Sequence, residues 1–377
     1  MQLIINRKEL LRGLVRTHSV ADKKGAMPIL SNVLLSTDGL KSLRISATDL
    51  YLSVSSTAEA DIQQGGMVAV SAKNLFDIVR SLPEGEVKLN LEEQQTVEIR
   101  SGKVRFRVPT MSGSDFPALP SPGESEFFEI SLELIGRLIG LTHYSMSNDE
   151  TRPHLSGAMF EGDGKILRMI TTDGHRLSKA EYKRAEGGEM LNFNMLIPNK
   201  GVIELKRLVE DLKSERAKGE EGAVIGITKA GGNAFFKRDD FLMSIKLTEE
   251  EFPPYSNVIP SAMEKRISVD RNLLMEALKR ISLVARDKSG VVRFTLSEGC
   301  LGIESENPEI GEGAEEIDLD YAGESLAIGF NARYWLEVLG ALTEDEVAIE
   351  LSGELDPGVI KPAGKTEFVG VIMPMRI

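Results

Sequence analysis

Apolar and polar positions along the chain predict strands and helices in a repeating order. Residues 2–6 alternate as a half-buried strand does, and apolar side chains then follow at helical spacing from Leu10 to His18. A second helix is predicted after Ser71, an N-cap residue, and Pro83-Glu84-Gly85 ends it. Strand-like runs surround these helices at residues 32–35, 42–47, 50–55, 67–70, 87–91, 96–100 and 104–108. The order strand, helix, several strands therefore occurs twice within residues 1–110.

The same double pattern recurs in each third of the chain. An isoleucine followed by a helix-like stretch opens residues 4–14, 130–141 and 267–278, so the starts lie 126 and 137 residues apart. The landmark Asp115-Phe116-Pro117 returns as Glu251-Phe252-Pro253, 136 residues later. Repeats of this length are domains rather than solenoid units. We expect an α+β protein of three similar domains, at 1–125, 126–260 and 261–377, whose function depends on shape more than on a catalytic pocket.

Linkers and loops are predicted where Pro, Gly, Ser and charged residues crowd. Residues 116–123 and 253–262 read as linkers between domains. Residues 218–223 and 356–365 read as loop excursions, because both are rich in Gly and charge.

Composition limits the class of protein. With 377 residues, 41% of them hydrophobic, the chain is long enough for two to three cored domains, and no apolar run reaches the roughly 18–20 residues of a membrane span. The first residues read as strand and helix rather than as a signal peptide. The single cysteine, Cys300, excludes an intrachain disulfide and a Cys-rich metal site. These features predict a cytoplasmic protein without a metal or cofactor.

The net charge of −13 is unevenly distributed. Six helix-like windows, at residues 6–24, 71–82, 131–147, 198–218, 270–288 and 331–342, together carry +9, which leaves −22 for the rest. An acidic surface repels phosphates, whereas a shared face of these helices would attract them. The split is either accidental or the mark of one mildly positive surface on an acidic protein.

Sequence motifs for catalysis are few. No P-loop, dinucleotide fingerprint, nucleophile elbow or metal-ligand spacing occurs. Asp173 and His175, within Thr172-Asp173-Gly174-His175-Arg176, suggest a hydrolase dyad, although no nucleophile accompanies them. The favoured interpretation is a tight turn in which Gly174 takes a positive φ and Asp173 accepts from backbone amides. Cys300 is interpreted as a structural thiol rather than a nucleophile.

Two charged strands suggest an interface between copies of the chain. Lys103, Arg105 and Arg107 alternate with Phe106 and Val108 on one strand. A strand-like segment near the other end is acidic, through Glu309, Glu312, Glu315 and Glu316. Opposite charges on two open sheet edges would pair the first domain of one copy with the third domain of another. The alternative is that each is a charged edge that resists aggregation.

Residues 369–377 stay apolar, which is unusual for a terminal segment. Met373 and Met375 flank Pro374 and suit an adaptable groove for peptides. The alternative, that the segment completes the last sheet, accounts for residues 369–373 better than for 374–377.

Several motifs together resemble the bacterial DNA sliding clamp, the beta subunit of the replicative DNA polymerase. The motifs run along the whole chain in the family's order: residues 27–30 (MPIL), 172–177 (TDGHRL), 198–205 (PNKGVIEL), 307–309 (NPE) and 373–376 (MPMR). The resemblance implies a head-to-tail homodimer of DNA-clamp domains, each with two helices packed on antiparallel sheets, that closes into a ring around double-stranded DNA. It implies a processivity factor with no catalytic residue. The partners implied are the alpha-type polymerase subunit, the clamp loader, other DNA polymerases, ligase and mismatch-repair proteins, most of them bound through short peptides.

The resemblance also implies roles for individual residues. Lys24 and Lys73 stand where relatives often have DNA-contacting arginines, and some relatives have two tyrosines where this chain has Pro153 and His154. The residues assigned to DNA are Lys24, Lys73, Arg80, Arg152, His154, Asn199 and Lys200. The residues assigned to the peptide pocket are Leu155, Thr172, Gly174, His175, Arg176, Leu177, Pro253, Val258, Met373, Pro374, Met375 and Arg376. At the dimer interface Phe106 and Val108 are expected to pack on Leu283 and Val284, flanked by Lys103, Arg105, Arg107 and the four glutamates.

Overall fold

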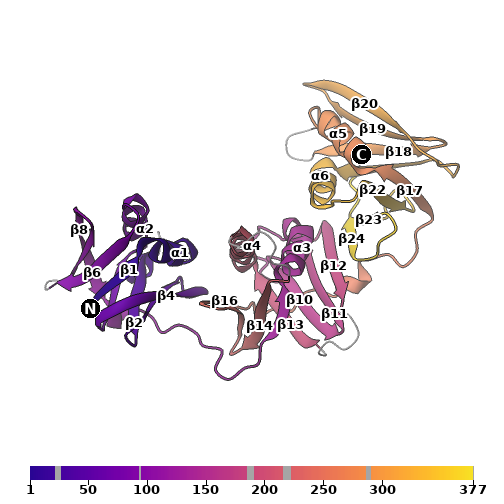
Figure 1. Ribbon diagram of the computed structural model, residues 1–377. Coiled ribbons are helices and arrows are strands. Elements are labelled where there is room, and N and C mark those ends of the chain that lie inside the picture. The colour runs from indigo at the N-terminus through magenta and orange to yellow at the C-terminus, as the bar shows by residue number, and fades with distance from the viewer. Residues whose placement is uncertain (22–26, 93–94, 185–190, 215–221, 286–289, 377) are drawn as a thin grey trace. The chain divides into compact units, whose positions relative to one another are not determined.

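The computed structural model describes residues 1–21, 27–92, 95–184, 191–214, 222–285 and 290–376 (Figure 1). Within these residues the predicted order of elements is confirmed, because strand, helix and three strands occur six times in succession. Strands and helices are numbered in chain order. A strand numbered eight higher, or a helix numbered two higher, therefore holds the same place in the next repeat.

The first repeat comprises β1 (Gln2–Asn6), α1 (Arg7–Thr17), β2 (Asn32–Asp38), β3 (Ser42–Thr48), β4 (Leu52–Gln64), β5 (Met67–Ser71), α2 (Ala72–Ser81), β6 (Glu86–Glu92), β7 (Thr96–Ser101) and β8 (Val104–Ser112). The second comprises β9 (Phe128–Ser131), α3 (Leu132–Thr142), β10 (Gly157–Gly164), β11 (Ile166–Thr172), β12 (Arg176–Lys183), β13 (Leu191–Pro198), α4 (Asn199–Ser214), β14 (Val224–Ala230), β15 (Asn233–Arg238) and β16 (Phe241–Lys246). The third comprises β17 (Lys265–Asp270), α5 (Arg271–Ile281), β18 (Val291–Ser297), β19 (Cys300–Asn307), β20 (Gly311–Asp318), β21 (Leu326–Asn331), α6 (Ala332–Ala341), β22 (Glu346–Leu351), β23 (Gly358–Pro362) and β24 (Phe368–Ile372).

The chain forms two compact units, one of residues 1–132 and 211–247 and the other of residues 133–210 and 248–377. The division follows the sheets. In the first unit β16 pairs antiparallel with β4, and in the second β24 pairs antiparallel with β12. The second and third repeats thus each donate their last strand to the sheet of the repeat before them. The domain edges at 125 and 260 stay a prediction.

Helices of one repeat pack side by side over the sheets, α1 with α2 in the first unit and α5 with α6 in the second (Figure 1). Leu10, Leu14, Leu75 and Val79 are fully buried on the facing sides of α1 and α2, as their helical spacing predicts. A second fixed contact joins each pair. Arg7, the first residue of α1, donates to Val79 O at 3.0 Å, near the end of α2.

The third repeat builds the same joint. Arg271, the first residue of α5, donates to Leu339 O at 3.1 Å on α6 and to Glu344 O at 2.8 Å just beyond it. A guanidinium at these positions satisfies carbonyl groups that a helix end leaves without intrahelical partners.

Three predictions about elements are wrong in detail. Helices α1, α3 and α5 end earlier than the windows drawn for them; at the end of α1, Thr17 Oγ1 donates to Gly13 O at 2.9 Å and His18 Nδ1 contacts Leu14 O at 2.8 Å. The strand expected at residues 50–55 extends through residue 64, because Ala58, Ala60 and Ile62 alternate into the core. The expected loop at 356–365 contains β23, whose Val359 and Ile360 are buried between β22 and β24.

Candidate functional site

The segment Thr172–Arg176 forms the tight turn that the sequence predicts. Asp173 Oδ1 accepts from the backbone N–H of His175 at 2.9 Å and of Arg176 at 3.1 Å, and Gly174 has φ +90°. Thr172 Oγ1 donates to Arg176 O at 2.6 Å and accepts from Gly174 N at 3.1 Å. The carboxylate and the hydroxyl therefore hold the loop that joins β11 to β12.

The same turn occurs in the other two repeats. Asp49 Oδ1 accepts from the N–H of Tyr51 at 2.9 Å and of Leu52 at 2.6 Å, and Asn307 Oδ1 accepts from Glu309 N at 2.9 Å. Tyr51 and Glu309 thus stand where the middle repeat has His175. An Asp–His dyad needs the histidine, but this turn forms without it, so Asp173 has a structural role.

Arg176, assigned to the peptide pocket, is an internal anchor. Its side chain is only 7% exposed and lies 4.4 Å from the ring centroid of Tyr334. Its guanidinium pairs with Asp173 at 3.1 Å and with Glu337, and it donates to Tyr144 O at 2.5 Å. Burial raises the pKa of both Tyr144 and Tyr334. Arg176 therefore joins the turn to α6.

Sequence analysis did not assign Tyr144, Tyr334 or Glu337 to this site. Tyr334 and Glu337 lie three residues apart on α6, a spacing that places them on one helix face, and this was the available signal.

An apolar cluster adjoins the turn. Leu177 packs with Ile170, Val359 and Val371, and Phe252 and Tyr255 pack against them. Pro253 lies between these two aromatic residues in the sequence, and Val258, which is 44% exposed, follows Tyr255 by three residues. Tyr255 also donates to Glu161 Oε2 at 2.9 Å, and burial first, then this carboxylate, raises its pKa to about 12. Val359, Val371 and Tyr255 were missed, since only the folded sheet brings them beside Leu177.

The terminal segment lies along this surface. Met373 N donates to His175 O at 2.9 Å, and Met375 N donates to Gly329 O at 2.8 Å. On the other side of the turn, Leu155 lies within contact distance of Gly174. The structure thus brings together Leu155, the turn, Leu177 and the Met373–Met375 segment around an exposed His175 and Met373.

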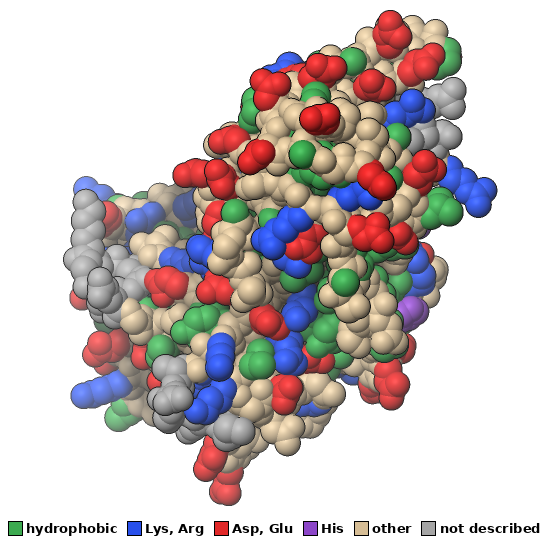
Figure 2. Space-filling view, turned by 90° about the vertical axis from the view of Figure 1, so that its right-hand side faces the viewer, with side chains coloured by type: hydrophobic (Ala, Val, Ile, Leu, Met, Phe, Trp, Pro, Cys, Tyr) green, Lys and Arg blue, Asp and Glu red, His purple; other side chains and the backbone are tan. Residues whose placement is uncertain are grey.

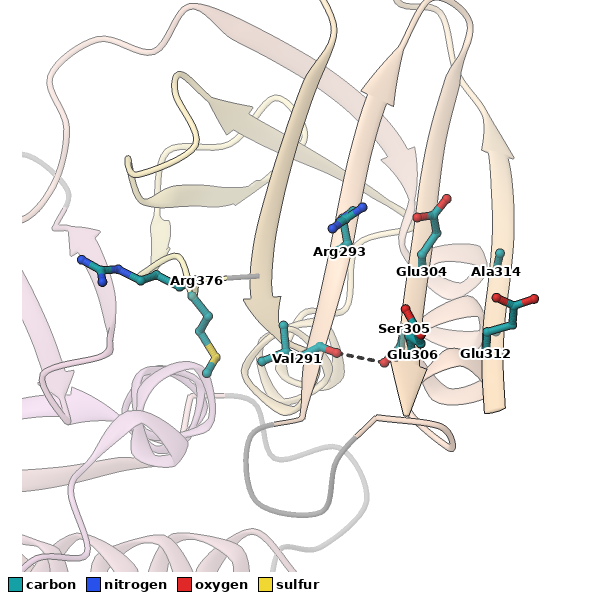
Figure 3. Close-up of a pocket in the computed structure, with 10 residues that line it drawn as sticks. Val291, Arg293, Glu304, Ser305, Glu306, Glu312, Ala314 and Arg376 are labelled. Carbon is teal, nitrogen blue, oxygen red and sulfur yellow. Dashed lines mark hydrogen bonds between the residues drawn. The ribbon is translucent and has the colours of Figure 1, made fainter. Parts of the chain in front are cut away.

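A hollow of about 900 Å³ borders Met375 and Arg376 on the four-stranded sheet of β18–β21. Figure 3 shows Arg293 on β18 beside Glu304 on β19, and Glu312 on β20 at the far edge. In Figure 2 acidic side chains gather in the upper part of the molecule, where Figure 1 has β18–β20. The sheet surface next to the terminal segment is therefore strongly acidic.

Residues assigned to DNA lie on helices and one loop. Lys73 and Arg80 are exposed on α2, seven residues apart and so on one face, and Arg80 lies 5.5 Å from the ring centroid of Phe76. Lys24 lies outside the described residues.

In the second unit the assigned residues are joined by one loop. Asn199 N donates to Ser156 O at 2.9 Å, so the start of α4 adjoins the loop that carries Arg152 and His154. Arg152 pairs with Asp149 at 2.9 Å, and Lys200 follows on α4 with an exposed side chain.

Residues assigned to the dimer interface lie on β8 and β20, in the turns beside them (Lys103 and Glu309), and just after α5 (Leu283 and Val284). On β8 Phe106 is 37% exposed, whereas Val108 is 5% exposed and belongs to the chain's own core. Arg105 and Arg107 lie 2.7 and 3.9 Å from the buried Glu98. On β20 Glu312 and Glu316 are exposed, but Glu315 pairs with Arg280.

Three sequence models match nearly the whole chain. They describe the N-terminal, central and C-terminal domains of the DNA polymerase III beta subunit and cover residues 1–120, 129–254 and 256–376. The chain is 32% identical to the beta sliding clamp of Pseudomonas aeruginosa over 379 residues and 33% identical to that of Escherichia coli K12 over 380, with 100% of both chains covered each time.

The chain belongs to the beta sliding clamp family.

Solved clamp structures agree. The crystal structure of the beta subunit from Pseudomonas aeruginosa matches with a TM-score of 0.93 at 31% identity, over 100% of both chains. A sliding clamp of the same organism bound to griselimycin matches with a TM-score of 0.91 at 31% identity, also over 100% of both. The predicted clamp fold of three similar domains is confirmed, and the hydrolase alternative finds no support.

Three further features of the described residues concern metal binding, the single cysteine and membrane spans. Among the described residues no group of three or more His, Cys, Asp or Glu is placed to hold a metal ion. Burial, followed by Glu316 and Asp318, raises the pKa of the Cys300 thiol, which makes it a poorer nucleophile. No helix in the described part of the chain is long and apolar enough to cross a membrane.

Proposed function

We propose that two copies of this clamp subunit close head to tail into a ring around double-stranded DNA. The ring tethers DNA polymerases and other replication and repair proteins through short peptides, and it catalyses no reaction. Membership of the family supports the processivity role, and the geometry of the strands supports the ring.

One observation carries the ring. Strand β4 pairs with β16, and its equivalent β12 pairs with β24, so each repeat joins the next through the same two strands. In the third repeat the strand equivalent to β4 and β12 is β20. In the first repeat the strand equivalent to β16 and β24 is β8. Strand β20 pairs only with β19, and residues 104–109 of β8 pair only with β7, among the described strands. Two open edges at opposite ends of the chain are the arrangement that a closed head-to-tail dimer uses up.

The charge distribution supports DNA as the content of the ring. The six helices carry 15 Lys and Arg against 8 Asp and Glu, a net +7 that leaves −20 on the rest of the chain. Modest positive charge on the helices attracts phosphates without reading sequence, so contacts exchange as the clamp slides. Lys73, Arg80, Arg152, Asn199 and Lys200 are the proposed contacts. Because Pro153 and His154 replace two tyrosines, His154 is the only remaining stacking group there.

The surface between Leu155, Leu177 and the Met373–Met375 segment is the proposed peptide groove. Its apolar floor, the Leu177 cluster, is fixed by sheet pairing, and its methionine wall adapts to different side chains. Arg176 contributes by holding the turn in place. In the interface Phe106 is proposed to pack on Leu283 and Val284 of the second copy.

Retention on DNA tests the proposal. Clamps assembled around nicked circular DNA should remain bound at salt concentrations that remove ordinary DNA-binding proteins, and cutting the circle once should release them. Binding to linear DNA that is as durable as binding to the circle would contradict a ring and indicate simple electrostatic binding.

A further inference from the structure

Two junctions lie inside the chain, where β16 pairs with β4 and β24 pairs with β12. An equivalent ion pair occurs at each of them. Arg12, the sixth residue of α1, lies with its guanidinium 2.9 Å from Asp240 Oδ2. Arg137, the sixth residue of α3, lies 3.3 Å from Glu367 Oε2. Asp240 and Glu367 each precede the phenylalanine that begins the donated strand, β16 or β24. At each junction a cation on the first helix therefore meets an anion just before the next repeat's last strand.

Strand register confirms that these positions correspond. Phe241 pairs with Ser56 across the first junction, and Phe368 pairs with Ala180 across the second. Within their own hairpins Ser56 faces Ile45, Ala180 faces Met169, and Glu315 of β20 faces Ile303. Glu315 on β20 is therefore equivalent to Ser56 on β4. Val104, the first residue of β8, is equivalent to Phe241, because each follows a two-residue turn.

The corresponding charges are reversed at the two open edges. The sixth residue of α5 is Glu276 rather than arginine, and the residue before β8 is Lys103 rather than an acid. Both are exposed. Glu276 has 51% of its side chain exposed and pairs at 2.7 Å with Lys279, three residues on; surface pairs of this kind exchange easily.

The neighbouring position changes in the same sense. Arg16, the tenth residue of α1, is buried and held by Asp240 of the next repeat at 3.0 Å. Arg280 holds the same place on α5 but is neutralised within its own repeat by Glu315. A strand arriving at β20 would therefore meet Glu276 and an Arg280 that is already paired with Glu315, whereas a strand arriving at β4 meets two arginines.

We propose that this reversal selects the partner of each open edge, so that Lys103 of one copy pairs with Glu276 of the second. The inference rests on the head-to-tail ring proposed above and adds what makes its closure selective. If β8 approached β4 or β12, Lys103 would face Arg12 or Arg137; if β16 or β24 approached β20, Asp240 or Glu367 would face Glu276. Like charges thus oppose each of these four pairings, and among β4, β12 and β20 only β20 offers Lys103 a carboxylate at this position.

If β8 pairs with β20 in the register of the two inner junctions, further residues of the two strands come to face each other. Phe106 would lie opposite Gly313, beside which Val284 Cγ2 is 3.1 Å from the position of a Cβ. Arg107 would lie opposite Glu312. A Cβ on residue 313 would press tightly on Val284, so the glycine leaves space for Phe106.

A mixing experiment tests the charge reversal. Lys103→Glu and Glu276→Lys are made separately, and each homodimer then contains two junctions of like charge. We expect each to dissociate at least about tenfold more readily than the unaltered dimer, because a closed ring contains the junction twice. In a mixture of the two variants both junctions of the mixed ring regain opposite charges. Native mass spectrometry should therefore find mixed dimers well above the statistical share, and the double variant should dimerise as the unaltered chain does.

The control is Lys88→Glu, which makes the same charge change on exposed β6 of the same sheet. It should leave both dimerisation and mixing unchanged. Homodimers of the two variants as stable as the unaltered dimer, or a statistical mixture, would overturn the charge reversal while leaving the ring intact. An unaltered chain that stays monomeric at micromolar concentration would instead overturn the ring itself.

Discussion

At the scale of single residues, a buried side chain organises the surface proposed as the peptide groove. Arg176 satisfies its charge with Asp173, Glu337 and Tyr144 O, and so fixes the turn and α6 together. The three repeats share the Asx turn, but only the middle one adds this arginine. The groove therefore depends on a buried ion pair whose loss leaves carboxylates without a partner.

Arg176→Ala should lower the free energy of unfolding by about 3 kcal/mol, because removing one partner from a buried ion pair leaves the other charge uncompensated. Urea denaturation measures the change. Arg152→Ala is the matched control, since Arg152 is 42% exposed and pairs with Asp149 at the surface; it should change stability by less than about 1 kcal/mol. Equal losses in the two variants would show that Arg176 is an ordinary surface cation.

His143 gives the stability a pH dependence. Burial first, then Lys206, lowers the pKa of its imidazole, and Lys206 Nζ lies 3.1 Å from Nε2, with Glu210 as the opposing charge. The folded state therefore binds a proton less readily than the unfolded state. The associated stability is complete above the unfolded pKa of about 6.5 and is lost as the pH falls below it.

His143→Gln should flatten the fall in stability between about pH 7 and pH 5, measured by urea unfolding across that range. His18→Gln is the control, because His18 makes the same contact with a helix carbonyl and stacks on Phe76 at 4.1 Å. A slope that flattens equally in both variants would assign it to the shared carbonyl contact and not to the Lys206 neighbour.

At the scale of elements, the terminal segment is the proposed wall of the peptide groove and lies outside the edge strands β8 and β20. Its backbone bonds go to His175 O and Gly329 O, both in the second unit. Deleting residues 373–377 should therefore lower the affinity for a labelled polymerase peptide by at least about 100-fold, as measured by fluorescence anisotropy. The dimer should stay intact. Leu283→Ala removes a side chain that is 76% exposed on the proposed interface. This change should weaken the dimer and leave peptide binding unchanged. A deletion that keeps peptide affinity would remove the segment from the groove.

Periodicity in the sequence predicts these elements because each helix shows one apolar face and each strand alternates. It fails at element ends, where local bonds decide: side chains of Thr17 and His18 close α1 before the apolar pattern stops. It also fails for β23, where Gly and charged residues around Val359 and Ile360 hide a short buried strand. The turn at Asp173 was predictable because Asx turns are local. The anchoring of Arg176 was not, since Glu337 lies 161 residues away.

At the scale of the whole molecule, closure depends on edges that are already partly neutralised. Arg105 and Arg107 lie over Glu98, and a hydrogen bond from Arg100, with these arginines, lowers the pKa of that carboxyl. Reversing both arginines to Glu would place two further anions beside Glu98 and disturb the first domain as well as the interface. Loss of a dimer in such a variant would therefore have two explanations.

Replacing Arg105 and Arg107 by Gln distinguishes a disturbed first domain from a weakened interface. Gln at 105 can still donate to Glu98 and Gln at 107 to Glu92, the acids that Arg105 and Arg107 contact at 2.7 and 3.2 Å. Thermal unfolding of the chain should therefore shift little, while attraction to Glu312 and Glu316 of a second copy is lost. We expect the dimer to dissociate about tenfold more readily at low salt, and the difference from the unaltered chain to shrink toward 1 M salt, where charges are screened within about 3 Å. Analytical ultracentrifugation across this salt range measures both. A weakening that is the same at every salt concentration would mean that these arginines act by packing around Phe106 and that charge does not draw the two edges together.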